Sequence, residues 1–139
     1  MTTLVQSSQG GSLAQAATRH GLGTVAAVRP GCALTAEGGP ARDAFLVLDG
    51  VARVTRDGRL VGEVGPGQFV GEMGLIDHRP RSASVVAVSA MRVIAFDAPA
   101  FEALLADPVV DREVRRQVVG RLRALLLTPI EEPNRRNQP

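Results

Sequence analysis

Hydrophobic residues in the first two thirds of the chain fall in short runs that glycine, proline and aspartate interrupt. Such runs, bounded by turn residues and rich in valine, predict β-strands rather than helices. The runs that we assign as strands are 24–28, 32–35, 44–48, 51–55, 60–64, 82–88 and 92–96. No apolar run approaches the ~20 residues that a membrane-spanning helix needs, so we expect no contact with a membrane.

Asp-Gly pairs and a Gly-Pro-Gly segment mark the turns between these runs. The pair at 49–50 joins 44–48 to 51–55 and predicts a tight β-hairpin, because a primed turn needs residues that accept a positive φ. The pair at 57–58 predicts a second reversal, and residues 65–67 predict a third, with proline presetting φ at one turn position.

Helical patterns lie at the two ends of the chain. Residues 12–19 fit a short helix with Ser12 as its N-cap, and the polar segment 1–11 is expected to be disordered. Asp97 can cap a helix that runs to about residue 106. Asp107 and the proline after it predict the start of a second helix that runs to about residue 127.

The second of these helices carries an apolar stripe, followed by a polar segment at 128–139 that we expect to be disordered. The stripe consists of Val110, Val114, Val118, Leu122 and Leu125 or Leu126, at i, i+4 spacing. It has two alternative partners, the strands of the same chain or the helix of a second copy. Strands first and helices last predict a mainly β fold, a roll or barrel with flanking helices.

Composition narrows the function classes. A length of 139 residues suits one domain, and 16 basic residues, all of them arginine, against 14 acidic ones give a net charge of only +2. Nucleic-acid binders usually carry a stronger basic stripe, and single-strand binders need more aromatics than four Phe without Trp or Tyr. A single cysteine excludes an intrachain disulfide, and the chain does not open like a secretory signal, so we expect a cytoplasmic location.

The segment 65–87 carries the candidate chemistry. A short helix is predicted over 71–76, and its free amides and positive end favour an anion. Arg81 can bind phosphate oxygens with two hydrogen bonds, and Ser82 adds a hydroxyl donor. Because Glu72 would repel a phosphate, its expected partner is a hydroxyl group, such as a ribose 2′-OH. These groups together suit a sugar phosphate with one negative charge.

This segment resembles the phosphate-binding cassette of the cyclic nucleotide-binding domain, as found in bacterial cAMP receptor proteins and the regulatory subunit of cAMP-dependent kinase. The family core reads F-G-E-x-[AG]-L-[LI], a variable loop, and P-R-[SAT]-A-x-V-x-A. This chain reads FVGEMGLI at 69–76 and PRSASVVA at 80–87. The resemblance covers roughly residues 23–127, and it departs from the core pattern at Val70, where the bacterial receptors also carry an aliphatic residue.

The resemblance implies an eight-stranded, jelly-roll-like β-roll with a short cassette helix and C-terminal lid helices, within a domain that spans 12–127. It implies that Glu72 accepts the ribose 2′-OH and that Arg81 binds the cyclic phosphate. The residues implied to bind the ligand are Val70, Gly71, Glu72, Met73, Arg81, Ser82 and Ala83, with Arg121 and Leu125 added from the last helix. Leu125 stands where the bacterial receptors read the adenine amino group with a threonine, so we expect an apolar contact with the base.

We therefore expect a non-catalytic sensor of cAMP, with cGMP as the alternative ligand, that needs no cofactor or metal. No nucleophile–base pair and no histidine spacing for a metal is visible in the sequence. The expected mechanism is closure of the last helix over the ligand, with an unknown effector protein or a second copy as partner. We expect Arg81 to be dispensable for the fold when there is no phosphate to neutralise.

Two alternatives stay open. One is a regulator of transcription that acts through another chain, because the sequence ends after the lid instead of continuing into the receptors' helix-turn-helix domain; we expect no sequence-specific DNA binding of its own. The other is an interaction module that kept the fold and lost the ligand.

Overall fold

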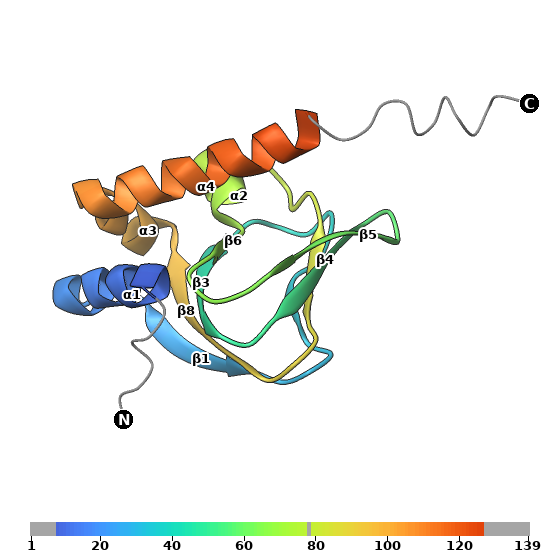
Figure 1. Ribbon diagram of the computed structural model, residues 1–139, viewed down its shortest axis with the longest axis horizontal. Helices are drawn as coiled ribbons and strands as arrows, with labels where there is room; N and C mark the ends of the chain where they lie inside the picture. Colours follow the sequence, from blue (N-terminus) through green and yellow to red (C-terminus); the bar gives the residue numbers. More distant parts are fainter. Residues whose placement is uncertain (1–7, 78, 127–139) are drawn as a thin grey trace, which may run out of the picture.

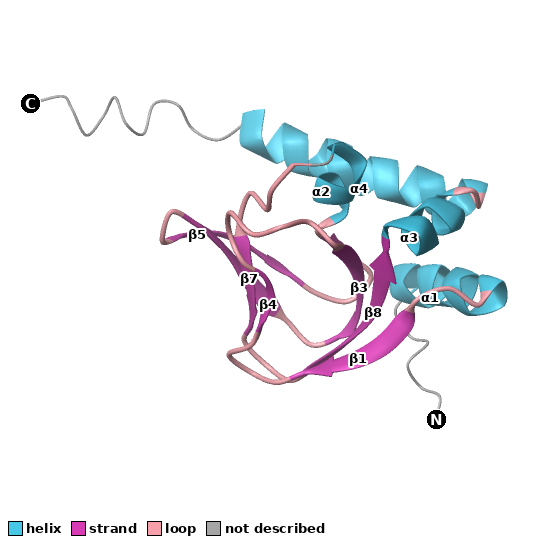
Figure 2. Cartoon of the chain, turned by 180° about the vertical axis from the view of Figure 1, so that it is seen from behind, coloured by secondary structure: helices cyan, strands magenta, loops and turns pink. Residues whose placement is uncertain are grey.

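The strands form a β-roll of two four-stranded antiparallel sheets, and the helices gather on one side of it (Figures 1 and 2). The computed structural model describes residues 8–77 and 79–126 of the 139 residues. The strands are β1 (Thr24–Val28), β2 (Ala33–Thr35), β3 (Asp43–Asp49), β4 (Ala52–Arg56), β5 (Arg59–Val64), β6 (Phe69–Val70), β7 (Ser84–Ala87) and β8 (Met91–Asp97). The helices are α1 (Ser8–His20), α2 (Glu72–Asp77), α3 (Ala98–Leu105) and α4 (Pro108–Leu126). The mainly β fold is thereby confirmed, with eight strands in the part of the chain that the structure describes.

The strand order is β1-β8-β3-β6 in one sheet and β2-β7-β4-β5 in the other. The hairpin predicted at 57–58 is confirmed, since β4 and β5 pair with Arg56 opposite Arg59. Both turn residues have a positive φ, 53° for Asp57 and 77° for Gly58, as a type I′ turn requires.

The hairpin predicted at 49–50 is wrong. β3 pairs with β8 and β6, whereas β4 pairs with β7 and β5, so the chain passes from one sheet to the other at Gly50. Gly50 has a φ of 91°, and a Cβ atom there would lie 2.6 Å from Cγ of Met91. The chain therefore turns a tight corner against the start of β8, and only glycine fits at this corner. Asp49 accepts a hydrogen bond from Arg92 at 2.8 Å instead of taking part in a hairpin turn.

The apolar pattern does not predict β6, because a strand of two residues is too short to show an alternation. β6 pairs with β3 at the edge of the first sheet, with Phe69 opposite Leu46 and Val70 opposite Phe45. This edge leads directly into α2, so β3 fixes the place where the cassette helix begins.

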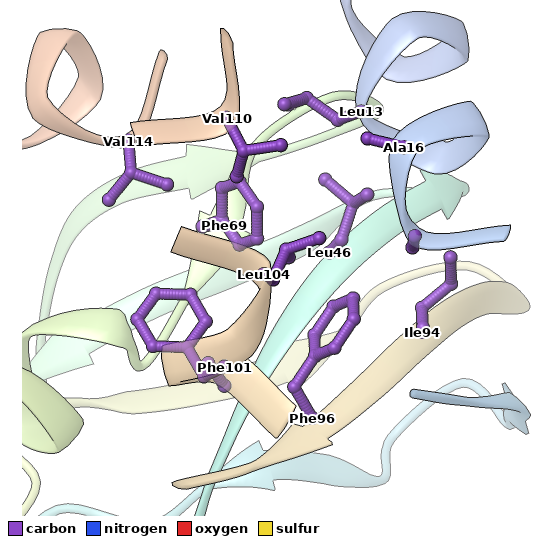
Figure 3. Close-up of a cluster of buried hydrophobic side chains, with 12 residues drawn as sticks. Leu13, Ala16, Leu46, Phe69, Ile94, Phe96, Phe101, Leu104, Val110 and Val114 are labelled. Atoms are coloured by element: carbon purple, nitrogen blue, oxygen red, sulfur yellow. The ribbon is translucent and has the colours of Figure 1, made fainter. Parts of the chain in front are cut away.

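The first core cluster lies between the helices and the β1-β8-β3-β6 sheet (Figure 3). The rings of Phe69 and Phe101 meet edge to face with centroids 5.9 Å apart. Burial of each such ring stabilises the fold by about 1.5–3 kcal/mol. The buried members are Leu13, Ala16, Ala17, Ala44, Leu46, Phe69, Ile94, Phe96, Phe101, Leu104, Val110 and Val114. A second cluster, built from side chains of both sheets, fills the roll itself.

The N-terminal helix is longer than expected. α1 begins at Ser8, so Ser12 lies inside the helix and is not its N-cap, and residues 8–11 are helical rather than disordered. Leu13 of α1 is buried in the first core cluster, and this burial outweighs the weak helix propensity of the serine and glycine residues before it. Residues 1–7 and 127–139, which include the predicted disordered tail, lie outside the described residues.

The two C-terminal helices begin as predicted. Asp97 caps α3 by accepting a hydrogen bond from the amide of Ala100 at 2.9 Å, and Asp107 accepts one from Val109 of α4 at 2.9 Å. The apolar stripe of α4 is buried at its start and exposed towards its end. Its first members, among them Val110, pack on the first core cluster, whereas Leu122 is 45% exposed.

Asp107 also ties the end of α1 to the junction between α3 and α4. Its Oδ2 atom lies 3.1 Å from Nη2 of Arg19 and 3.1 Å from Nε2 of His20. The hydrogen bonds with His20 and with the amide of Val109 hold the pKa of Asp107 below its ordinary value. The start of α4 is therefore anchored to α1, and its far half extends over α2 (Figure 1).

Candidate functional site

The junction between β6 and α2 places Glu72 beneath α4. Gly71 makes this junction with a φ of 81°, and a Cβ atom there would lie 3.1 Å from the carbonyl oxygen of Asp43 and still closer to the guanidinium of Arg81. A side chain at position 71 would therefore clash as well as strain the backbone. Because residue 71 has no side chain, the Arg81 guanidinium can lie directly against the backbone of the cassette.

Glu72 is fully buried, with 0% of its surface exposed. One carboxylate oxygen, Oε2, forms an ion pair with Nη1 of Arg121 from α4. The other, Oε1, has no hydrogen-bond partner among the residues that the structure describes. A buried carboxylate oxygen without a donor is costly, so this atom is ready to accept a hydrogen bond from a hydroxyl group.

Arg81 is also buried, with 8% of its surface exposed. Its guanidinium donates to two backbone carbonyls, that of Gly71 at 2.8 Å and that of Asp43. Its own backbone is fixed by hydrogen bonds with the 38–39 turn, from Gly38 to the Arg81 carbonyl at 2.8 Å and from the Arg81 amide to Gly39 at 2.9 Å. The arginine therefore has partners within the chain, and the expectation that the fold does not use it is wrong.

Burial lowers the pKa of the Arg81 guanidinium from its ordinary value, while the nearby charges of Asp43 and Glu72 raise it. An arginine stays protonated under all these influences. The site therefore keeps one buried cation next to one buried carboxylate, a combination that suits a ligand with both an anionic group and a hydroxyl group.

Two side chains of α4 cover the free edge of β6. The amide of Phe69 donates to Oε1 of Gln117 at 2.9 Å, and its carbonyl oxygen accepts from Nη2 of Arg121. Gln117 also donates to the carbonyl of Gly67 at 2.9 Å. Strand edges need such partners, because unpaired backbone groups are costly when buried. The lid helix is thus hydrogen-bonded to the strand that leads into the cassette.

The remaining predicted ligand residues are placed differently from one another. Val70 is buried within the roll, whereas Ser82 is exposed and its carbonyl accepts a hydrogen bond from Arg56 at 3.1 Å. The carbonyl of Ala83 accepts from the hydroxyl of Thr35 at 3.0 Å. Met73 and Leu125 belong to α2 and α4, but their side chains lie outside what the structure describes. Contact of any of these residues with a ligand stays a prediction.

A hollow of ≈ 170 Å³ opens beside Arg81. Its lining consists of Leu34, Thr35, Ala36, Gly39, Pro40, Arg42, Asp43, Phe45 and Arg81. Among the described residues, Arg81 is the one predicted ligand residue in this lining. Ligand pockets usually measure about 300–1,000 Å³, so this hollow by itself is too small to enclose a nucleotide.

Sequence reasoning missed two groups at this site. Gln117 shares one face of α4 with Arg121 at i, i+4 spacing, and this spacing could have indicated it once the lid was assigned to the cassette. The Asp43 carbonyl gives no signal in the sequence, because a backbone acceptor depends only on how β3 is placed.

Among residues 8–77 and 79–126 there is no group of three or more His, Cys, Asp or Glu residues arranged to hold a metal ion. Within the same part of the chain, no helix combines the length and the apolar character needed to cross a membrane.

Known regulators resemble this chain in sequence and in structure. A protein of Mycobacterium tuberculosis named as a CRP-like cAMP-activated global transcriptional regulator is 30% identical over 94 residues, which are 63% of this chain and 42% of that protein. This chain therefore spans less than half the length of that relative. The catabolite activator protein of Thermus thermophilus superposes with a TM-score of 0.71 at 26% identity, over 91% of this chain and 61% of that one.

Two further structures agree with this fold. The N-terminal domain of a transcriptional regulator from Streptomyces coelicolor gives a TM-score of 0.62 at 25% identity, over 89% of this chain and 95% of that one. A cyclic nucleotide-binding domain from Methylobacillus flagellatus gives 0.60 at 31% identity, over 73% and 61%. The sequence model of the family described as "cyclic nucleotide-binding domain" matches residues 25–107, which hold Glu72 and Arg81. This chain belongs to the cyclic nucleotide-binding domain family.

Proposed function

We propose that this chain is a non-catalytic cyclic nucleotide sensor that responds to cAMP, with cGMP as the alternative ligand, and reports the bound state through α4. The observation that supports this proposal is the shared use of Glu72. Its buried carboxylate holds Arg121 of the lid helix with one oxygen and leaves the other oxygen without a donor among the described residues. The group that would receive the ribose hydroxyl is the same group that holds the lid.

The cyclic phosphate would bind at Arg81. A phosphate is a charged acceptor that takes two parallel hydrogen bonds from a guanidinium, whereas the carbonyls of Gly71 and Asp43 are neutral acceptors. The phosphate therefore competes with these carbonyls for the guanidinium. Amides around Gly71 and of Ser82 and Ala83 would complete the phosphate pocket.

The lid would respond through the contacts that α4 makes with β6 and α2. A ribose hydroxyl on Glu72 changes the partner set of this carboxylate, and α4 with Arg121 and Gln117 moves to a new position in which Leu125 covers the base. Ligand must bind one position of α4 more tightly than the other, with a coupling of about 1–3 kcal/mol. The output is a change in the surface that α4 offers to an effector protein.

The choice of cAMP follows the relatives, and a cytoplasmic location is proposed because a single cysteine allows no intrachain disulfide. The Mycobacterium tuberculosis protein is named for activation by cAMP, and cAMP is therefore the first ligand to test. The net charge of +2 favours a protein partner over sequence-specific DNA for this chain itself.

Two observations favour the rival function, an interaction module without a ligand. Arg81 already has two carbonyl partners, and the hollow beside it measures only ≈ 170 Å³. A nucleotide must therefore open the site before it can bind.

Calorimetric titration with cAMP and cGMP separates the two functions, with 5′-AMP as a control that has the same base and an open phosphate. We expect cAMP to bind with a Kd in the micromolar range or tighter. At about 100 times Kd it should stabilise the fold by about 2.7 kcal/mol, measured by circular dichroism because the chain has no Trp or Tyr. No heat of binding and no shift of the melting temperature with either cyclic nucleotide would establish the interaction module instead.

A further inference from the structure

The β4–β5 hairpin touches the cassette at the segment that follows Arg81. In the second sheet β4 lies between β5 and β7 (Figure 2). The pairing of β4 with β7 ends where Thr55 lies opposite Ser84. Arg56, the last residue of β4, lies one position beyond this pair, and its Nε atom donates a hydrogen bond to the carbonyl of Ser82 at 3.1 Å. The side chain of Arg56 therefore connects the hairpin to the backbone of the cassette.

The tip of this hairpin is held in place by Glu37 from the loop between β2 and β3. Oε1 of Glu37 accepts a hydrogen bond from the amide of Asp57 in the hairpin turn at 3.0 Å. The amide of Glu37 donates to the hydroxyl of Ser84 at 2.9 Å. Because both bonds are made by one residue, the hairpin turn and the start of β7 are held close together. Arg56, which is half-buried, is therefore fixed next to the segment that it contacts.

Three successive carbonyl groups at 81–83 accept hydrogen bonds, whereas two amides of the same segment have no acceptor. The carbonyls accept from the amide of Gly38 at 2.8 Å, from Nε of Arg56 at 3.1 Å and from the hydroxyl of Thr35 at 3.0 Å, in the order Arg81, Ser82, Ala83. The amides of Ser82 and Ala83 donate to no other residue in the part of the chain that the structure describes. These two amides are therefore available to a ligand.

The carbonyl of Ser82 and the amide of Ala83 belong to the same peptide group. A trans peptide is planar, so its C=O and N–H bonds point in opposite directions. A donor that holds the carbonyl on one side therefore fixes the direction of the amide on the other side. We propose that Arg56 is a positioning residue, which directs the Ala83 amide at the cyclic phosphate by holding the Ser82 carbonyl. This inference rests on the proposed function, in which the Ala83 amide binds the phosphate.

A direct contact between Arg56 and the phosphate is the competing role. The Nε atom of Arg56 is already bonded to the Ser82 carbonyl, and a phosphate with one negative charge has Arg81 as its cation. The two roles make different demands on the side chain. Positioning needs a hydrogen-bond donor at the place of Nε, whereas direct contact needs a positive charge.

Arg56→Gln and Arg56→Met separate these roles. The amide nitrogen of a glutamine side chain is as many bonds from Cα as the Nε atom of arginine, so this variant keeps a donor and loses the charge. Methionine has a similar length but no donor. Calorimetric titration with cAMP compares both variants with the wild type, and Arg56→Ala replaces Arg56→Met if the latter does not fold. Arg53→Met, at an exposed position of the same strand, is the matched control for the lost charge.

We expect Arg56→Met to weaken cAMP binding by about tenfold, because a hydrogen bond to a charged group has at least this value. Arg56→Gln should stay within about twofold of the wild type, since a donor remains at the place of Nε. Arg53→Met should leave the affinity unchanged.

The two phosphorothioate analogues of cAMP, Rp and Sp, test whether the effect passes through one phosphate oxygen. Each carries sulfur in place of one exocyclic oxygen, and sulfur is a weak hydrogen-bond acceptor. The analogue whose sulfur faces the Ala83 amide should bind the wild type less tightly and lose little more in Arg56→Met. The other analogue should lose the full factor of about ten, as cAMP does. A general loss of structure would weaken the binding of both analogues equally.

Four results would overturn the proposal. Arg56→Met that binds cAMP like the wild type would remove the positioning role and leave the proposed function intact. Arg56→Gln that binds as weakly as Arg56→Met would establish direct contact through the charge. Equal losses for the two phosphorothioates would mean that Arg56 only stabilises the fold. A wild type that binds no cyclic nucleotide would overturn the proposed function and this inference with it.

Discussion

Arg121 of α4 and Glu72 of α2, which are 49 residues apart in the sequence, form an ion pair in which the glutamate side chain is 1% and the arginine 34% exposed. The lid helix is therefore held to the cassette by an ion pair whose carboxylate is buried and has no access to water. Any movement of α4 must supply Glu72 with another partner.

Arg121→Ala should destabilise the fold, because it leaves a buried carboxylate without its cation. We expect a loss of about 2–3 kcal/mol in the free energy of unfolding, less than the ~3–5 for a fully buried pair since Arg121 is partly exposed. Urea denaturation measures this loss. Arg123→Ala, on the exposed side of the same helix, is the control and should stay within about 0.5 kcal/mol of the wild type. The double variant with Glu72→Gln should regain part of the loss, since the unpaired charge is then absent; a strictly additive result would contradict the pairing.

Glu72→Ala should weaken cAMP binding more than it weakens binding of 2′-deoxy-cAMP. The Oε1 atom of Glu72 has no donor among the described residues, and a hydrogen bond from the ribose hydroxyl to a charged acceptor contributes about 1.5–3 kcal/mol. Calorimetric titration of both ligands against wild type and variant gives the difference. Equal losses for the two ligands would mean that Glu72 does not receive the 2′-OH.

Arg81→Ala should remove most of the affinity for a cyclic nucleotide, on the order of 3–5 kcal/mol, because the buried phosphate loses its counter-charge. Arg81→Lys keeps the charge but not the planar fork, and should also weaken binding substantially. Both variants should also be less stable, since the carbonyls of Gly71 and Asp43 lose a donor at about 1–3 kcal/mol for each unsatisfied group. Titration and thermal melting measure the two effects, with the exposed Arg59→Ala as control. Binding within threefold of the wild type would show that Arg81 is a structural residue only.

Gly50→Ala and Gly31→Ala form a matched pair for the corner between β3 and β4. Their φ angles are nearly equal, at 91° and 88°, but a Cβ atom contacts Met91 at position 50 and meets nothing at position 31. Gly31→Ala should cost about 1–2 kcal/mol from backbone strain alone. Gly50→Ala should cost a further ~1–3 kcal/mol from overpacking. Equal costs in urea denaturation would contradict the crossing between sheets at this corner.

Asp107→Asn should destabilise the anchor between α1 and α4 in a manner that depends on pH. Because the pKa of Asp107 is held below its ordinary 3.8, its ionised form contributes stability that is fully present above 3.8 and is lost as the pH falls through the lowered pKa. The stability difference between wild type and variant should therefore be constant at neutral pH and disappear in acid. Asp111→Asn, in the first turn of the same helix, is the control. A difference that persists at the acid limit would assign the effect to capping rather than to charge.

The sequence predicted most of the strands and the helix caps, because these depend on residues close together in the chain. It failed at 49–50, where the same Asp-Gly signal that makes a hairpin at 57–58 instead marks a corner between sheets. Local turn chemistry allows both outcomes, and contact with β8 decides between them. The first residue of α1 could also not be predicted from the sequence, because packing of Leu13 in the core, rather than helix propensity, stabilises this helix.

At the candidate site, the identities of the motif residues were predictable, but the backbone groups that they contact were not. Glu72 and Arg81 belong to a motif, and the structure buries both, Glu72 against Arg121 of α4 and Arg81 against the carbonyls of Gly71 and Asp43. The carbonyl acceptors of Arg81 and the Gln117 bonds to β6 arise from backbone groups, which are the same in every residue and give no pattern.

The two hydrogen bonds that α4 makes with the outer edge of β6 link amide hydrogen exchange at β6 to the position of α4. The Phe69 amide is protected from deuterium only while Gln117 accepts its hydrogen, whereas amides in the centre of the sheet are protected by neighbouring strands. When the lid helix moves away from β6, the Phe69 amide loses its acceptor Gln117 and can exchange with solvent. The rate of amide hydrogen exchange at Phe69 therefore reports how often the lid helix opens. This measurement needs no label attached to the protein.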